Sequence, residues 1–358
     1  MKNKKILELC LSPGLGGLEM FSFSCYESFS KETECKIVVA PNEKLDNFIE
    51  SEEKHLVQRS KFFPFIPALK LAKYIDANDI DIIHFHWTRD MITAVLAKLI
   101  SQKKPKLVQS RHMGMTRFKD DFYHRFLYKH IDMIHAVTLK VKEQLEHFIP
   151  KDVRPEIEMV YLGVSASQVD ASLVENLRKK YKSNDEFIVG IVGRIEEGKG
   201  QYKVIEALAK LKEKNIKLLV VGSSMQESYL EELKQKVKEL GIEDKVIFTG
   251  FTKNVHEYMQ IFDVNVLATE NETFGLVVIE AMINKVAMIA TNKGGPLEII
   301  EDGVDGLLFD GSVEDLAMQI QRLSDSKELR ARVAQAGFEK VQEKFDKNKQ
   351  IKKLYNVL

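Results

Sequence analysis

Two cations in a glycine-rich loop are the first residues whose types could do chemistry. Arg194 and Lys199 stand in "GIVGRIEEGKG" (Gly190–Gly200), between an apolar run and a helical pattern. An arginine offers a planar fork to a phosphate and a lysine offers a point charge. The N-terminus of the following helix adds free N–H groups and a partial positive charge. The loop favours a diphosphate, and the alternative is an exposed loop with ordinary surface charges.

Two carboxylates flank a second predicted helix start. The mostly apolar stretch "TENETFGLVVIEAM" carries Glu272 before the helix and Glu280 inside it. At about 100° per residue the two do not share one helix face, so we interpret them as separate hydrogen-bond acceptors around an anion. A sugar nucleotide offers hydroxyls on both sides of its diphosphate. The alternative is a charge at the helix start and a solvated helix residue.

Glycines follow two further predicted strands. In "SPGLGGLEM", Gly14, Gly16 and Gly17 would let the backbone approach a ligand at a helix start. A dinucleotide fingerprint is the competing interpretation, but the third glycine and the acidic residue at the end of the next strand are missing. In "TNKGGPLEII", Gly294 and Gly295 predict a tight turn that brings backbone toward the same ligand.

The elements that must position these residues alternate between short apolar runs and helical patterns. This alternation implies right-handed crossovers and parallel sheets, and 358 residues exceed one ordinary core. We predict an α/β fold of two doubly wound Rossmann-like domains, residues 1–165 and residues 166–340. Ligands bind beyond the carboxyl ends of parallel strands, so we expect the domains to face across a cleft. A helix over 341–358 is predicted to pack back on the first domain.

Composition narrows the class of protein. Lys+Arg and Asp+Glu both number 53, so there is no global field for nucleic acid. Cys10, Cys25 and Cys35 match no metal or redox spacing. Glu8 and the Ser-Pro-Gly after it interrupt the apolar start, which argues against a signal peptide. No run approaches the ~18 apolar residues of a membrane span. We expect a cytoplasmic protein.

The motifs together resemble a known family. "GRIEEGKG", "TENETFGLVVIEAM", "TNKGGPLEIIEDGVDGLLF" and the amino-terminal "GGLEM" resemble, in order and spacing, retaining glycosyltransferases of the GT-B fold, family 4 (glycosyl transferases group 1). The resemblance covers most of the chain and is densest over Gly190–Phe309. It implies that residues 1–165 form the acceptor side and that residues 166–340 bind the nucleotide sugar. It implies that Arg194 and Lys199 hold the donor diphosphate. It also implies that Glu280 accepts from the nucleotide ribose and that Glu272 contacts the donor sugar.

Further site residues come from the same resemblance. Phe274, Gly275 and Leu276 would place backbone N–H groups at the sugar and phosphate. Gly16 and Gly17 would approach the diphosphate from the first domain, and His112 would lie near the reacting sugar. The sequence departs from the family at Thr273, where a glycine is usual, which bears on the choice of donor. It also has Tyr161-Leu162-Gly163 where the family often has Asn-Gly.

The implied reaction moves a hexose-like sugar from a nucleotide diphosphate to a hydroxyl of a glycan or lipid-linked acceptor, with retention. No metal and no cofactor are expected, and cell-surface polysaccharide or lipopolysaccharide biosynthesis is the expected setting. Two alternatives stay open. A sugar-nucleotide epimerase would use the same donor site without an acceptor, and a partner protein would keep the fold without catalysis.

Two features of the first half allow more than one interpretation. His84, His86 and His112 make a zinc site conceivable, although packing or lining the acceptor side is favoured for the strand histidines. Arg59–Tyr74 and Arg117–His130 mix cations with aromatic residues. Such surfaces suit peripheral contact with the inner face of a membrane, and they equally suit helices packed on their own core.

Overall fold

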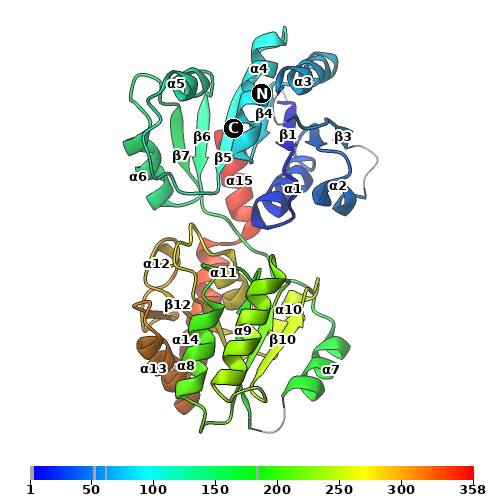
Figure 1. The fold of residues 1–358 in the computed structure, drawn as a ribbon. Coiled ribbons are helices and arrows are strands. Elements are labelled where there is room, and N and C mark those ends of the chain that lie inside the picture. Colours follow the sequence, from blue (N-terminus) through cyan, green and yellow to red (C-terminus); the bar gives the residue numbers. More distant parts are fainter. Residues whose placement is uncertain (1–3, 51–53, 61–62, 183–184) are drawn as a thin grey trace. The chain divides into compact units, whose positions relative to one another are not determined.

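The computed structural model describes residues 4–50, 54–60, 63–182 and 185–358 and forms two compact units (Figure 1). Unit 1 comprises Met1–Leu162 with Asn348–Leu358, and unit 2 comprises Gly163–Lys347. Each is an α/β unit built on one parallel sheet, which confirms the predicted fold class. The chain leaves unit 1 close to the predicted boundary at residue 165. It returns later than residue 341, because one continuous helix of unit 2 runs to Lys344.

Unit 1 holds a seven-stranded parallel sheet in the order β3-β2-β1-β4-β5-β6-β7. Its strands are β1 (Ile6–Cys10), β2 (Cys35–Val39), β3 (His55–Leu56), β4 (Ile82–Phe85), β5 (Lys106–Arg111), β6 (Met133–Ala136) and β7 (Glu156–Met159). Its helices are α1 (Gly17–Phe29), α2 (Lys44–Phe48), α3 (Phe65–Asn78), η1 (Thr88–Asp90), α4 (Met91–Ile100), α5 (Phe122–Lys129), α6 (Leu139–Phe148) and, across the return of the chain, α15 (Lys347–Val357).

Unit 2 holds a six-stranded parallel sheet in the order β10-β9-β8-β11-β12-β13. Its strands are β8 (Phe187–Val192), β9 (Ile216–Val221), β10 (Val246–Gly250), β11 (Val264–Leu267), β12 (Ala287–Thr291) and β13 (Leu307–Phe309). Its helices are α7 (Ala171–Tyr181), α8 (Gln201–Lys210), α9 (Glu227–Glu239), α10 (Val255–Met259), α11 (Leu276–Ile283), α12 (Pro296–Ile299), α13 (Val313–Asp325) and α14 (Lys327–Lys344).

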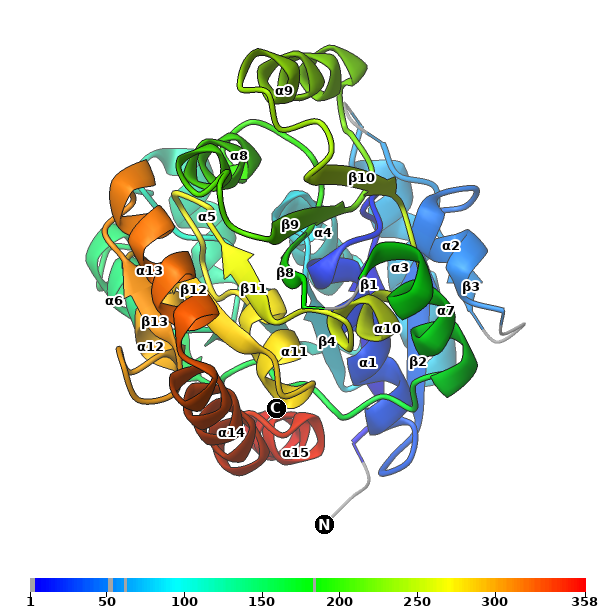
Figure 2. The ribbon, with the colours of Figure 1, turned by 90° about the horizontal axis from the view of Figure 1, so that it is seen from below.

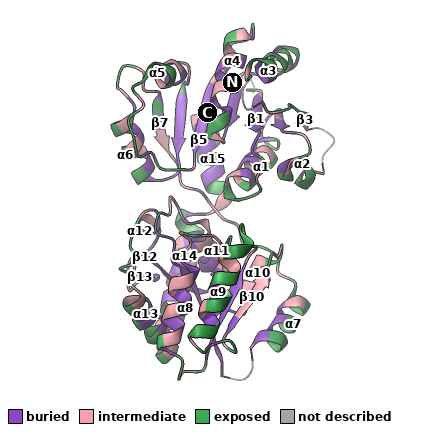
Figure 3. Cartoon of the chain, in the orientation of Figure 1, coloured by how far each residue is buried: buried purple, intermediate pink, exposed green. Residues whose placement is uncertain are grey.

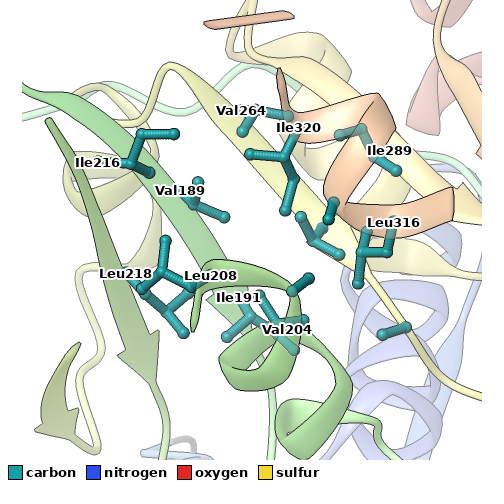
Figure 4. Close-up of a cluster of buried hydrophobic side chains, with 14 of the residues drawn as sticks. Val189, Ile191, Val204, Leu208, Ile216, Leu218, Val264, Ile289, Leu316 and Ile320 are labelled. Carbon is teal, nitrogen blue, oxygen red and sulfur yellow. The ribbon is translucent and has the colours of Figure 1, made fainter. Parts of the chain in front are cut away.

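Near-continuous apolar strands place the core of each unit between its sheet and its helices. Burial follows this arrangement, with buried strands and half-exposed helices (Figure 3). In unit 2, α8 packs against α13 and α11 against α14 (Figure 2). Val204 and Leu208 of α8 and Ile320 of α13 meet the strands in the main buried cluster (Figure 4). This packing holds the loops at the carboxyl ends of the strands in place.

The two chain connections between the units run side by side within unit 2. The Val164 N–H donates to the Phe345 carbonyl at 2.9 Å, and the Lys347 N–H donates to the Val164 carbonyl at 3.0 Å. A Cβ on Gly163 would lie 2.6 Å from the Lys347 Cα. The glycine of "YLG" is therefore required by this close approach of two backbone segments.

The described helices include none that combines the length and the apolar composition needed to cross a membrane.

Candidate active site

The loop between β8 and α8 is held by glycines against the end of β11. Gly200 caps α8 with φ at 77°, and a Cβ there would lie 2.3 Å from the Ala268 carbonyl oxygen. The Glu270 N–H donates to the Gly198 carbonyl at 3.3 Å. The loop that carries both predicted diphosphate cations is thus fixed on the exit of the neighbouring strand.

This contact brings two predicted site residues together. Lys199 Nζ lies 3.6 Å from Glu272 Oε2, although the residues are far apart in sequence. In the same loop, Arg194 Nη2 lies 3.2 Å from Glu196 Oε1. Ion pairs at an accessible surface contribute little net stability. Both cations can therefore exchange a carboxylate for a phosphate at small cost.

The start of α11 follows directly. Gly275 caps the helix with φ at 99°, and no side chain of a described residue accepts from the first N–H groups of the helix. The Phe274 side chain is buried, with its ring 6.0 Å from that of Phe345, so its backbone is what the loop presents. The Thr273 N–H donates to Glu272 Oε1 at 3.1 Å. Leu276 opens a helix whose N-terminus favours an anion.

The exit of β12 supports the same segment. The Gly295 N–H donates to the Glu272 carbonyl at 3.0 Å, and a Cβ on Gly294 would lie 2.2 Å from that same oxygen. The glycine pair thus packs backbone to backbone on the segment that holds Glu272.

Glu280 lies in the second turn of α11 and is half-buried. Burial raises the pKa of its carboxyl to about 7, because desolvation disfavours the charged form. Among the described residues no side chain or N–H group donates to this carboxyl. The carboxyl is therefore available as a hydrogen-bond acceptor for a ligand.

The glycine loop of unit 1 has a built-in partner. Glu19 accepts from the Gly16 N–H at 2.9 Å and is hydrogen-bonded to the Ser12 hydroxyl. The first of these bonds is the half of a capping box that a glycine at the N-cap allows. Gly17 is the first residue of α1. In this structure the Gly16 N–H is already satisfied, so a diphosphate at this loop would have to compete with Glu19.

The three histidines considered for a zinc site, His84, His86 and His112, are hydrogen-bonded to protein groups. His84 contacts Glu8 at 2.8 Å and Ser110 at 2.7 Å, while His86 contacts Glu8 at 2.6 Å. His112 Nε2 lies 3.4 Å from His86 Nδ1. Both ring nitrogens of the two strand histidines are engaged, which supports the packing interpretation over zinc. One possible ligand atom each from Glu8, Cys25 and His84 lies within 4.8 Å of the other two. The ring nitrogens of His84, however, are already hydrogen-bonded to Glu8 and Ser110.

Sequence reasoning missed part of this cluster. Glu8, Ser110 and His135 are fully buried in it. The available signal was a glutamate inside the apolar run "ILELC" and histidines spaced two apart in "IDIIHFHW". Each of these is a polar residue at a core position of a strand.

Comparison with known proteins agrees with these features. The sequence model of Glycosyl transferases group 1 matches residues 174–340, and that of Glycosyltransferase Family 4 matches residues 33–168. The N-acetyl-alpha-D-glucosaminyl L-malate synthase of Bacillus anthracis is 30% identical over 292 residues, covering 79% of this chain and 75% of that protein.

Two further relatives extend the match. The N-acetylgalactosamine-N,N'-diacetylbacillosaminyl-diphospho-undecaprenol 4-alpha-N-acetylgalactosaminyltransferase of Campylobacter jejuni is 26% identical, covering 86% of each chain. The crystal structure of Anabaena HepE in complex with UDP and glucose matches the fold with a TM-score of 0.86 at 21% identity, over 99% of this chain and 100% of that one. The chain belongs to the group 1, family 4 glycosyltransferases of the GT-B fold.

Proposed function

We propose that this glycosyltransferase transfers a hexose-type sugar from a nucleoside diphosphate to an acceptor hydroxyl, with retention of anomeric configuration. The observation that carries the proposal is the placement of Lys199 beside Glu272 at 3.6 Å, on the loop before α11. One cation, one helix N-terminus and one carboxylate then meet where a diphosphate joins a sugar. Glu280, four residues into α11, is the acceptor for the ribose.

The leaving diphosphate gains charge as the bond from the anomeric carbon to the phosphate oxygen breaks. Arg194, Lys199 and the N–H groups at the start of α11 stabilise that charge, and their preorganisation makes the effect large. In this proposal the charge stabilisation comes from the chain's own groups and needs no metal ion.

Retention follows from attack on the face that the leaving group vacates. The acceptor oxygen bonds to the anomeric carbon, and the acceptor proton passes to the departing phosphate oxygen. Glu272 is paired with Lys199 in this scheme and contacts sugar hydroxyls without acting as a nucleophile.

The acceptor in this proposal is a glycan or a lipid-linked glycan of cell-surface polysaccharide or lipopolysaccharide biosynthesis. The support is a relative whose name specifies a diphospho-undecaprenol-linked acceptor. Exposed aromatic and apolar residues of unit 1, among them Phe63, Ile66 and Phe122, suit peripheral contact with the membrane that holds such an acceptor.

The first experiment identifies the donor. A thermal-shift panel of UDP-, GDP- and ADP-sugars should raise the melting temperature with the true donor, because a ligand stabilises the state it binds. UDP-glucose comes first in the panel, since the Anabaena structure holds UDP and glucose. Product analysis by NMR then tests retention. If the protein epimerises the donor sugar without an added acceptor, its activity is that of an epimerase and the proposed transfer is wrong.

Lys199→Ala tests the site itself. We expect kcat/KM to fall by about 100- to 1,000-fold, the range for removing one preorganised group that stabilises developing charge. Lys210→Ala is the matched control, because Lys210 ends the following helix in an exposed pair with Glu314. Full activity of Lys199→Ala would show that the diphosphate is held elsewhere.

A further inference from the structure

A row of buried polar side chains crosses four strands of the unit 1 sheet. Glu8 lies beside His84 in the pairing of β1 with β4, and Ser110 lies beside His135 in the pairing of β5 with β6. All four are fully buried. Two residues earlier on the same strands, and on the same face, stand only apolar residues: Ile6, Ile82, Val108 and Met133. Polar groups at such depth are costly unless each is hydrogen-bonded.

These side chains form one continuous hydrogen-bonded chain, here called the histidine chain. It begins at the Val160 carbonyl, which is 2.7 Å from His135 Nε2. It then runs through Ser110, His84, Glu8 and His86 to His112. The successive distances are 2.6 Å (His135 Nδ1 to Ser110 Oγ), 2.7 Å (to His84 Nε2), 2.8 Å (His84 Nδ1 to Glu8), 2.6 Å (Glu8 to His86 Nε2) and 3.4 Å (His86 Nδ1 to His112 Nε2).

The carbonyl at the inner end fixes the direction of every bond. A carbonyl oxygen only accepts, so His135 carries its proton on Nε2 and accepts at Nδ1. The hydroxyl of Ser110 has one hydrogen, which it donates to His135 Nδ1 in a hydrogen bond. Ser110 therefore accepts from His84 Nε2, which leaves His84 Nδ1 as a bare acceptor in the neutral ring.

That bare nitrogen assigns a proton to Glu8. The hydrogen between His84 Nδ1 and Glu8 must come from the carboxyl, so Glu8 is a neutral acid whose other oxygen accepts from His86 Nε2. Burial favours the same neutral forms. It raises the pKa of Glu8, and it lowers the pKa of His84 to about 3 and that of His86 to about 4. His86 Nδ1 then accepts from His112 Nε2.

We propose that Glu8, as a neutral carboxylic acid, is a positioning residue for His112. Through His86 it holds His112 in the tautomer protonated at Nε2, which leaves Nδ1 to accept from a sugar hydroxyl. The described residues give His112 Nδ1 no hydrogen bond, and the Phe21 ring packs edge-on at 5.3 Å against the His112 ring. The inference rests on the proposed function, in which His112 lies near the reacting sugar.

Two substitutions at Glu8 separate this role from packing. An amide donates from nitrogen and accepts at oxygen, so Glu8→Gln reproduces the hydrogen bonds of the neutral acid. Glu8→Met keeps a similar length and makes neither bond. We expect Glu8→Gln to keep kcat within a few-fold of wild type. Glu8→Met should lower kcat by about 10- to 100-fold, the usual effect of removing an orienting outer partner, with the donor KM little changed.

Gln109→Met is the matched control. Gln109 is buried on β5 next to Ser110 and points to the opposite face of the sheet. Among the described residues, neither its side-chain nitrogen nor its side-chain oxygen has a hydrogen-bond partner. We expect its kcat to match wild type, because the change removes a buried polar group without touching the histidine chain.

Nitrogen-15 NMR of histidine-labelled full-length protein reads the tautomer without any activity assay. The His112 signal, assigned with His112→Asn, should report Nε2–H in wild type and Glu8→Gln and a mixture of tautomers in Glu8→Met. A His112 protonated at Nδ1 in wild type, or a Glu8→Gln enzyme as slow as Glu8→Met, would overturn the inference. The expected tautomer in a wild-type enzyme that transfers no sugar would support the tautomer assignment and overturn the proposed function.

Discussion

The carboxyl of Glu280 lies where its ionisation lowers the stability of the folded protein. Its carboxyl is half-buried in the second turn of an apolar helix, and burial raises its pKa to about 7. No described side chain compensates the charge. A ribose hydroxyl that donates to this carboxyl would supply the missing partner.

Glu280→Gln should therefore raise stability while weakening donor binding. The folded carboxyl titrates near pH 7 and the unfolded one near about 4.3, so ionisation penalises the folded state increasingly from pH 4.3 to 7. The substitution should raise the melting temperature at pH 8 by a few degrees and leave it little changed near pH 4. It should also weaken donor binding, because an amide replaces the carboxylate acceptor.

Differential scanning fluorimetry across this pH range, together with donor titration calorimetry, tests both halves of the prediction. Glu243→Gln, at an exposed position after α9, is the control for the loss of one negative charge. A lower melting temperature of Glu280→Gln at pH 8, or unchanged donor affinity, would contradict the assignment.

At the scale of elements, the exit of one strand positions the exit of its neighbour. Gly294 follows β12 with φ at 73°, and its backbone lies so close to Glu272 that a Cβ would approach the Glu272 carbonyl oxygen to 2.2 Å. The position of the loop after β11, which carries Glu272, is thus set by a turn about 20 residues later in the chain. Any side chain at this turn must displace Glu272 or the turn itself.

Gly294→Ala and Gly303→Ala distinguish this contact from backbone strain alone. Gly303 has nearly the same φ, 76°, but no heavy atom of the described part of the chain would lie within 4 Å of a Cβ added there. Each alanine should cost about 1–2 kcal/mol for the left-handed backbone. Only Gly294→Ala should cost more in urea unfolding and also weaken donor binding. Equal losses in both variants would show that the close approach to Glu272 has no role.

At the scale of the whole molecule, the two units share one chain that passes between them twice. The tail helix α15 buries Ile351 and Leu354 in unit 1, beside Phe29 and Val108. The exposed apolar residues of unit 1 lie mainly in loops and helix starts that follow the carboxyl ends of β3 and β5. The exposed residues of these segments include Phe63, Phe65, Ile66, Met113, Phe118 and Phe122. Lys61 and Phe62, which belong to the same predicted surface, lie outside the described residues.

This surface predicts salt-dependent binding to anionic membranes. Phe63 and Phe122 are 72% and 88% exposed, and cations such as Lys70 and Arg117 are exposed in the same segments. In liposome sedimentation at low salt, the wild-type protein should bind vesicles that contain anionic lipid. The double variant Phe63→Ser, Phe122→Ser should lose most of this binding. Phe251→Ser is the control, an equally exposed aromatic change in unit 2. No binding by wild type at low salt would remove the membrane contact from the proposal.

The class of fold could be predicted from local patterns in the sequence. Apolar runs alternating with helical periodicity predicted two α/β domains with parallel sheets, since that periodicity records which face of each element is buried. The short strands β3 and β7 were not predicted. Glycines at strand exits, such as Gly200 and Gly275, marked the loops because a left-handed backbone favours that residue. The family, and hence the list of candidate site residues, followed from the order of those loops.

Tertiary structure alone decided which of these residues meet. The register between β1 and β4 places Glu8 beside His84. The residue pattern within either strand could not have predicted that pairing. The same holds for Lys199 beside Glu272 and for Gly163 against Lys347. Local sequence fixes the direction of a side chain from its own backbone. Its partner depends on strand order and on packing between distant segments, and these form only when the whole unit folds.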